Sequence, residues 1–141
     1  MGTWRAGLRV AGFLGMTVAI MPVQWLLIRF GLAGARSLPV RYHRLLCKLI
    51  GIKVTVKGTP VTDRPVLICA NHTSYLDIPV MSTVFPVSFI AKEEVSGWPG
   101  VSVLARLQET LFIERHRRGK AGEQAARIRE RLDRGDAIVL F

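Results

Sequence analysis

The stretch ICANHTSYLDIPV, residues 68–80, joins two apolar segments through a mostly polar heptad. The apolar lead-in RPVLICA is typical of a strand buried in a sheet. The apolar residues that follow the heptad, 78–84, can form a short helix. Asn71, Thr73 and Ser74 favour turns, because their side chains hydrogen-bond to the local backbone. We therefore expect a strand, a turn and a helix, with the polar heptad at the carboxyl end of the strand, where open α/β sheets bind ligands.

The heptad contains a histidine and an aspartate five positions apart, His72 and Asp77. On a continuous helix this spacing would separate them by about 140° around the axis, so only a turn can bring them together. A histidine oriented by a carboxylate is the base half of a catalytic triad. The sequence has no G-x-S-x-G elbow, so such a pair would deprotonate a hydroxyl of the substrate itself. Spacing alone favours the simpler alternative, a turn histidine and an N-capping Asp77 without chemistry.

The rest of the chain from residue 51 alternates between strand and helix patterns. The expected strands are IKVTVKG (52–58), VSFIAK (87–92), TLFIER (110–115) and AIVLF (137–141), and the expected helices follow Pro99 and span 120–134, with Gly135 as the C-cap. In the second helix Ala121, Ala125, Ile128 and Leu132 form an apolar stripe that we assign to the core. This order predicts an α/β fold with a largely parallel or mixed sheet and flanking helices.

The N-terminal part contains an uncharged apolar segment, VAGFLGMTVAIMPVQWLLI, at residues 10–28. Its length suits a membrane helix, and Pro22 is expected to kink it. Three interpretations stay open: a spanning helix, a helix or kinked pair in one leaflet, and a signal peptide cleaved near AGA at 33–35. More Lys and Arg follow the segment than precede it, so a spanning helix would leave the remainder in the cytoplasm.

Positive charge is concentrated around this segment. Residues 1–62 carry nine Lys or Arg and no Asp or Glu, whereas residues 63–141 carry eleven basic and ten acidic residues. Such a distribution fits anionic lipid headgroups and argues against a nucleic-acid-binding surface on the α/β domain. We expect a membrane-associated helical segment at 1–50 and an α/β domain at 51–141.

The two cysteines, Cys47 and Cys69, both lie in apolar surroundings and form no CxxC pair. We interpret them as buried, reduced thiols and expect no bound metal, because the sequence has no His/Cys cluster. The chain closes on the apolar run AIVLF, which resembles a buried strand, and we therefore expect it to be the N-terminal part of a longer protein.

Several of these segments resemble a known family. NHTSYLD (71–77) resembles the Asn-His-x-x-x-x-Asp block of the glycerolipid acyltransferases, typified by 1-acylglycerol-3-phosphate acyltransferases. LCKLIGIKVTVKG (46–58) is similar to the family's lead-in after its membrane helices. LFIER (111–115), within a longer similar stretch, resembles its second block, and Phe141 stands where its third block, Phe-Pro-Glu-Gly-Thr, should begin.

The resemblance implies the roles of individual residues. It implies that His72 is the general base on the acceptor hydroxyl, that Asp77 orients it, and that Arg115 grips a phosphate of the acceptor. A planar guanidinium suits that last role. Lys92 and Asn71 are further substrate-binding candidates. The implied donor is acyl-CoA or acyl carrier protein, with no cofactor, and the implied location is a bacterial-type inner membrane with the catalytic domain facing the cytoplasm.

The acceptor follows less directly. The resemblance points first to 1-acyl-glycerol-3-phosphate, giving phosphatidic acid. However, Glu109 stands where the second block often begins with Gly, Glu114 takes its acidic position, and GWPGVSVLARLQETLFIER (97–115) resembles the branch that acylates lyso-ornithine lipid at least as much. A different class of function also stays open, namely a non-catalytic, membrane-anchored lipid-binding module.

Overall fold

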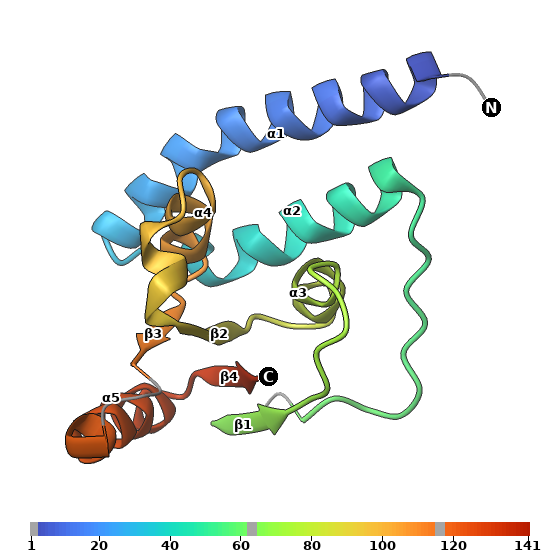
Figure 1. The fold of residues 1–141 in the computed structure, drawn as a ribbon. Helices are drawn as coiled ribbons and strands as arrows, with labels where there is room; N and C mark the ends of the chain where they lie inside the picture. Colours follow the sequence, from blue (N-terminus) through green and yellow to red (C-terminus); the bar gives the residue numbers. More distant parts are fainter. Residues whose placement is uncertain (1–2, 62–64, 115–117) are drawn as a thin grey trace. The chain divides into compact units, whose positions relative to one another are not determined.

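The computed structural model describes residues 3–61, 65–114 and 118–141 (Figure 1). The chain forms two compact units. The helical unit comprises Met1–Thr59 and Ser74–Pro86, and the sheet unit comprises Pro60–Thr73 and Val87–Phe141. The chain thus leaves the helical unit after residue 59, enters the sheet unit for one strand, and returns for residues 74–86. The domain boundary expected between residues 50 and 51 stays a prediction.

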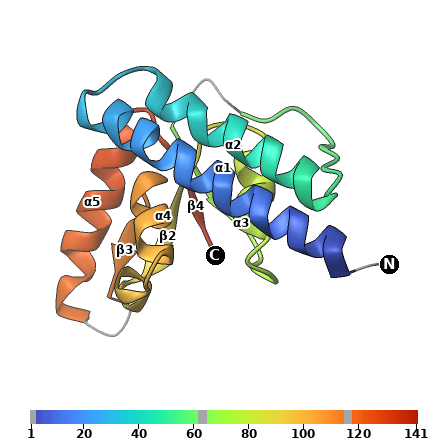
Figure 2. The same cartoon turned by 90° about the horizontal axis from the view of Figure 1, so that it is seen from above.

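The helical unit begins with two long helices that lie side by side, α1 (Thr3–Arg29) and α2 (Gly34–Ile50) (Figure 2). Pro22 lies inside α1, yet the helix continues through it for 27 residues. The turn after α1 is closed by Gly31, which has a φ of 61°. Its amide donates to the Ile28 carbonyl, and the Leu32 amide donates to the Leu27 carbonyl, a Schellman ending that needs glycine's left-handed backbone.

Polar side chains of α1 are turned toward α2. The Thr17 hydroxyl lies 2.8 Å from the Tyr42 hydroxyl, and the Gln24 amide nitrogen donates to the Ala35 carbonyl at 2.9 Å. Thr17 and Gln24 are 7% and 4% exposed. Between the exposed arginines near its ends, Arg5, Arg9 and Arg29, the exposed face of α1 is mostly apolar instead. The large exposed hydrophobic side chains of α1 are Trp4, Leu8, Val10, Leu14, Val18, Val23, Trp25 and Leu26. A helix that is polar toward its partner and apolar on its exposed face is typical of membrane helices, where buried polar contacts join helices.

The short helix α3 (Asp77–Ser82) completes the helical unit and packs against α2. Arg44 of α2 donates from Nε to the Thr83 carbonyl at 2.8 Å, so a cation satisfies a carbonyl at the end of α3. The helix predicted at 78–84 is therefore confirmed, and it is fixed at its C-terminus by a side chain from α2.

The sheet unit contains four parallel strands, β1 (Val66–Cys69), β2 (Ser88–Lys92), β3 (Leu111–Ile113) and β4 (Ala137–Leu140), in the order β1-β4-β2-β3. These match four of the predicted strands and confirm the α/β class. Helices α4 (Val101–Leu107) and α5 (Ala121–Asp133) and the short 3-10 turns η1 (Glu93–Gly97) and η2 (Arg118–Lys120) join them. The central strand β4 contributes Ile138 and Val139, which are fully buried.

Helix α5 covers one face of the sheet. Its Ile128 and Leu132 pack against a core cluster of Ile90, Leu111 and Ile138. The other half of the predicted stripe is wrong, because Ala121 and Ala125 are exposed. The part of the stripe that packs on the core thus lies in the C-terminal half of α5.

The C-terminus of α5 is fixed by a glycine ending and by the side chain of Arg131. Gly135 has a φ of 82°, its amide donates to the Leu132 carbonyl, and the Asp136 amide donates to the Arg131 carbonyl, which confirms the predicted glycine ending. Arg131 itself forms an ion pair with Asp136 and donates to the Ser88 hydroxyl at 2.9 Å and the Glu109 carbonyl at 3.2 Å. It thereby joins α5 to the first residue of β2 and to the segments just before β3 and β4.

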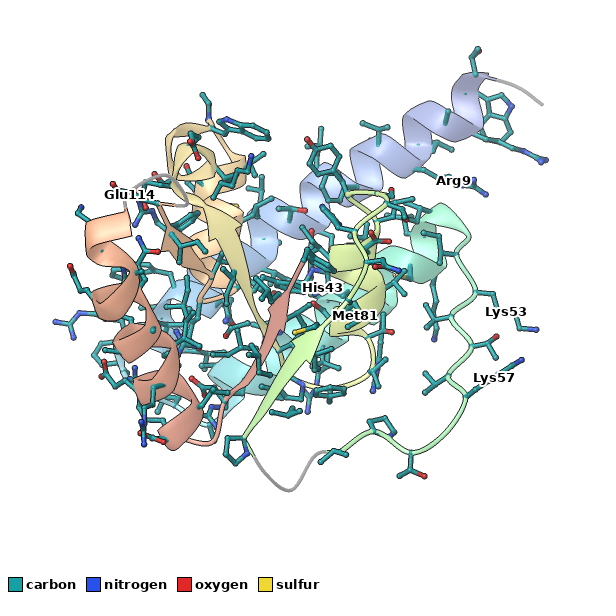
Figure 3. The ribbon with its side chains drawn as sticks, turned by 60° about the horizontal axis from the view of Figure 1, so that its bottom comes forward. Arg9, His43, Lys53, Lys57, Met81 and Glu114 are labelled. Carbon is teal, nitrogen blue, oxygen red and sulfur yellow. The ribbon has the colours of Figure 1, made fainter. Side chains whose placement is uncertain are left out.

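Two predictions are wrong. Residues 52–58 form no strand and pair with no other segment in the part of the chain that the structure describes. They run as an extended connection on which Lys53 and Lys57 point away from the helices of this unit (Figure 3). Of the three apolar residues of the alternation, Ile52 and Val54 are half-buried but Val56 is 51% exposed, and a strand also needs a hydrogen-bonding partner. Cys69, predicted to be buried, is exposed, because β1 is an edge strand and α5 does not cover it.

Candidate active site

Several predicted site residues gather at one edge of the sheet unit. In a parallel sheet all strands end at the same edge. Asn71 and His72 follow β1, Phe141 follows β4, and Lys92 is the last residue of β2. The prediction that the polar heptad follows the carboxyl end of a strand is confirmed, but the strand is not buried as predicted, because β1 lies at the edge of the sheet and Leu67 and Cys69 are exposed.

The backbone fixes where His72 begins its turn. Cys69 is in register with Leu140, and the Ala70 amide donates to the Leu140 carbonyl at 3.0 Å, one residue beyond the end of β1. This bond prolongs the β1–β4 pairing toward the heptad. As a result, the backbone stays paired with the end of β4 up to Ala70, and His72 follows two residues later.

Three aromatic rings then form a series at this edge. The imidazole of His72 stacks on the Phe141 ring, with centroids 4.3 Å apart and ring planes 22° from parallel. The Phe141 ring in turn stacks on Phe89 at 5.8 Å and 14°. Phe89 lies on β2 and is 4% exposed, whereas His72 is exposed, so the series runs from the core to the surface.

An open pocket of about 390 Å³ lies in the same unit. It is lined by Cys69, Ala70, Asn71, Leu140 and Phe141. The lining therefore includes the three residues just before His72, and also Phe141, the residue on whose ring His72 stacks. His72 itself is the next residue of the chain after this lining.

The turn after His72 is organised by Ser74. The Ser74 amide donates to the Asp77 carboxylate at 2.9 Å, the Leu76 amide donates to the Ser74 hydroxyl at 3.1 Å, and the Asp77 amide donates to the Ser74 carbonyl at 3.0 Å. These bonds confirm the predicted turn. Asp77 is not an N-cap, however, because it is the first residue of α3 and its carboxylate bonds back to the turn. Asp77 and Ser74 belong to the helical unit, and His72 to the sheet unit.

His43 does not compete with His72 for the base role. His43 is 8% exposed on α2, and burial lowers its pKa to about 4. His116 lies outside the described residues. His72 is the histidine that the structure places at a strand end on the surface.

Of the two residues predicted to bind an anion, Lys92 and Arg115, the structure describes only Lys92. Lys92 is exposed at the end of β2. Arg115 lies outside the described residues, directly after Glu114. Glu114, labelled in Figure 3, forms an ion pair with Lys120 at 2.7 Å, and its carbonyl accepts a bond from Gln124 at 3.2 Å. These two contacts anchor the end of the second family-like block to the start of α5.

The arrangement offers a surface imidazole with one face against a phenyl ring, beside an open pocket. Both imidazole nitrogens lie in the ring plane, so the stacked face leaves them able to exchange protons. The sequence did not predict the ring series, because Phe89 was interpreted as a strand residue and Phe141 as a strand residue at the start of the third family-like block. It also missed that Cys69 lines a pocket. The signal available was the position of Phe141 at the carboxyl end of a strand.

Comparison with known proteins identifies the class to which this fold and this edge of the sheet belong. A family model described as Acyltransferase matches residues 52–141. The chain belongs to this family.

Particular relatives carry more specific names. The chain is 42% identical, over all of its 141 residues, to a lyso-ornithine lipid O-acyltransferase of Brucella abortus, of which it covers 53%. It is 39% identical over 94 residues, 65% of the chain, to a 1-acyl-sn-glycerol-3-phosphate acyltransferase of Neisseria gonorrhoeae, of which it covers 36%. The chain thus spans about half the length, or less, of these relatives.

A solved structure has the same fold. The 1-acyl-sn-glycerophosphate acyltransferase PlsC from Thermotoga maritima matches 99% of this chain with a TM-score of 0.69 and 26% identity, over 61% of the PlsC chain. The match includes the N-terminal helices as well as the sheet, because nearly the whole chain is covered.

Proposed function

We propose that this chain carries the catalytic base of a membrane-bound acyltransferase, which moves a fatty acyl group from a thioester to the free hydroxyl of a lysolipid. The observation that carries the proposal is the position of His72. It lies at the carboxyl end of a parallel sheet, exposed beside an open pocket, within the residues matched by the family model. The donor is acyl-CoA or acyl carrier protein, used as a substrate, and no cofactor takes part.

The proposed reaction is a direct transfer. The His72 imidazole accepts the proton of the acceptor hydroxyl as that oxygen attacks the thioester carbonyl. The carbon–sulfur bond breaks, the new ester forms, and the leaving thiolate takes up the proton from the imidazolium. Asp77 is the proposed orienting carboxylate, held in its turn by the Ser74 amide. A base oriented by a carboxylate needs no acyl-enzyme when the nucleophile belongs to the substrate.

The proposed substrate-binding residues lie near the strand ends. Lys92, at the end of β2, is exposed at the same edge as His72 and offers a positive charge to an anionic substrate group. Arg115 is proposed to bind a phosphate or carboxylate bidentately. Asn71, in the pocket lining, is proposed to hydrogen-bond the substrate beside the base.

We propose lyso-ornithine lipid as the preferred acceptor. The relative that matches all 141 residues at 42% identity carries that name. The second candidate is 1-acyl-glycerol-3-phosphate, favoured by the similarity to the Neisseria enzyme and to PlsC. Both candidates are lysolipids with a free hydroxyl, so the proposed role of His72 is the same for either.

The helical unit is the proposed membrane anchor. By length and composition α1 can cross a membrane, and its exposed face is apolar. Arg36, Arg41, Arg44 and Lys48 of α2, together with Lys53 and Lys57, would face anionic headgroups. We propose that the protein lies in a bacterial-type inner membrane with the catalytic domain toward the cytoplasm.

The test is an acyl-transfer assay on the complete gene product that carries this chain. Purified protein is given acyl-CoA or acyl carrier protein with either lyso-ornithine lipid or 1-acyl-glycerol-3-phosphate at equal concentration. The proposal expects thioester consumption that depends on the acceptor, with a higher kcat/KM for lyso-ornithine lipid. A higher kcat/KM for the phosphate acceptor would overturn the acceptor assignment alone. Vesicle binding without any turnover would instead support the non-catalytic lipid-binding module.

A further inference from the structure

The rings of Phe89 and Phe141 form a platform under the imidazole of His72, and we infer that this platform positions the base for proton transfer. We use the term aromatic platform for Phe89 and Phe141 together. The inference rests on the proposed function, since it assigns Phe141 a role in the same reaction. All three rings belong to the sheet unit.

The first argument is the stacking geometry. Aromatic pairs are attractive when offset or edge-on, with centroids about 4.5–7 Å apart. The His72–Phe141 separation of 4.3 Å and the angle of 22° describe close face contact, and the Phe141–Phe89 pair at 5.8 Å and 14° continues it inward. A ring held by its face cannot tilt freely, and a neighbour stacked on the face does not cover the edge of the ring. The two nitrogens lie on that edge, so the platform restricts the imidazole without blocking its chemistry.

The second argument is how the platform is anchored. Phe89 is 4% exposed on β2, next to the fully buried Val139 of the central strand in the sheet register. Phe141 directly follows β4, whose Leu140 carbonyl receives the Ala70 amide two residues before His72. This hydrogen bond therefore holds together the two backbone segments that carry Phe141 and His72.

The third argument is charge. During the proposed reaction His72 becomes an imidazolium, and a cation over an aromatic face is stabilised by the ring quadrupole. A leucine of similar volume at position 141 would fill the space but provide no such face. The aromatic character of Phe141 is thus expected to affect the chemical step more than substrate binding.

The test uses variants of the complete gene product in the acyl-transfer assay. Phe141→Leu is expected to lower kcat about tenfold with KM changed less than about twofold, because misplacing a base acts on the chemical step. Phe141→Tyr keeps the ring and is expected to retain kcat within about threefold of the wild type. A matched control is Phe112→Leu on β3, which removes a buried ring, 8% exposed, that is not part of the platform. Its kcat is expected to stay within about twofold of the wild type, with only stability reduced.

A spectroscopic measurement on the wild type guards against a variant that fails to fold. In proton–carbon NMR spectra the ring protons of His72, assigned through His72→Gln, are expected upfield of ordinary histidine positions because of the Phe141 ring current. Ordinary positions would overturn the platform, and so would an unchanged kcat in Phe141→Leu when His72→Ala is inactive. If His72→Ala stays active, the proposed base itself is wrong.

Discussion

At the residue scale, the position of His72 follows from the sequence, but its surroundings do not. The switch from RPVLICA to polar turn residues predicted a strand end, and the structure places His72 there. The stacking on Phe141 could not be predicted, because the two residues are far apart in the sequence and meet only through the β1–β4 pairing. The exposure of Cys69 was missed for the same reason, since the order of strands decides which one lies at the edge.

The two cysteines provide a test at this scale. Cys69 is exposed in the pocket lining, whereas Cys47 is 3% exposed and burial raises the pKa of its thiol. Because the thiolate is the reactive form, a maleimide is expected to modify Cys69 at least about tenfold faster than Cys47 in the native protein. Mass spectrometry of peptides after timed labelling measures both rates. The control Cys69→Ser should label slowly until denaturant is added, and equal native rates would contradict the described burial.

At the scale of elements, the strands that contain a run of apolar residues were predicted correctly. The strand predicted from alternating residues was not, because it would need a neighbouring strand to pair with. VLIC, SFIAK, LFI and AIVL all form strands. The alternating residues 52–58 do not, because alternation reports which side chains face inward and says nothing about a neighbouring strand. Helix α5 was predicted with its glycine ending, yet half of its stripe is exposed, because the periodicity of a helix does not tell which of its turns meet the sheet.

Arg131 gives a prediction for these elements. Its side chain and that of Asp136 are each 12% exposed, and they form an ion pair that ties α5 to β4. Arg131→Met leaves the Asp136 carboxylate half-buried without its cation, so we expect a loss of about 3 kcal/mol of unfolding free energy. The matched control is Arg134→Met, which breaks an exposed ion pair with Glu130 and should cost less than about 0.5 kcal/mol. Urea unfolding followed by circular dichroism measures both, and equal effects would contradict the role of Arg131.

At the scale of the whole molecule, the sequence predicted a membrane-associated helical part and an α/β part, and the structure contains a helix pair and a parallel sheet. It could not predict that residues 74–86 would join α1 and α2, because that grouping depends on contacts between α2 and α3. Asp77 therefore begins a helix that packs on the proposed membrane anchor. Membrane attachment and the proposed orienting carboxylate share one structural unit.

Attachment of the helical unit to membranes is testable by vesicle flotation. If the apolar face of α1 inserts, binding to vesicles of anionic and zwitterionic lipid should persist at about 1 M salt, where the screening length is only about 3 Å. Val18→Asp, at a position 68% exposed on α1, is expected to reduce the bound fraction at high salt. Val103→Asp, 43% exposed on α4, serves as the control and should bind like the wild type. Release of the wild-type protein by salt would show attachment by surface charge alone.

The measurement that tests the central claim most directly is the acyl-transfer rate of His72→Ala in the complete gene product, with folding checked by circular dichroism. Removing a general base normally costs about 100-fold or more, so kcat/KM for the preferred lysolipid is predicted to fall by at least about that factor. A His72→Ala enzyme that stays within about tenfold of the wild type would contradict the assignment of His72 as the catalytic base.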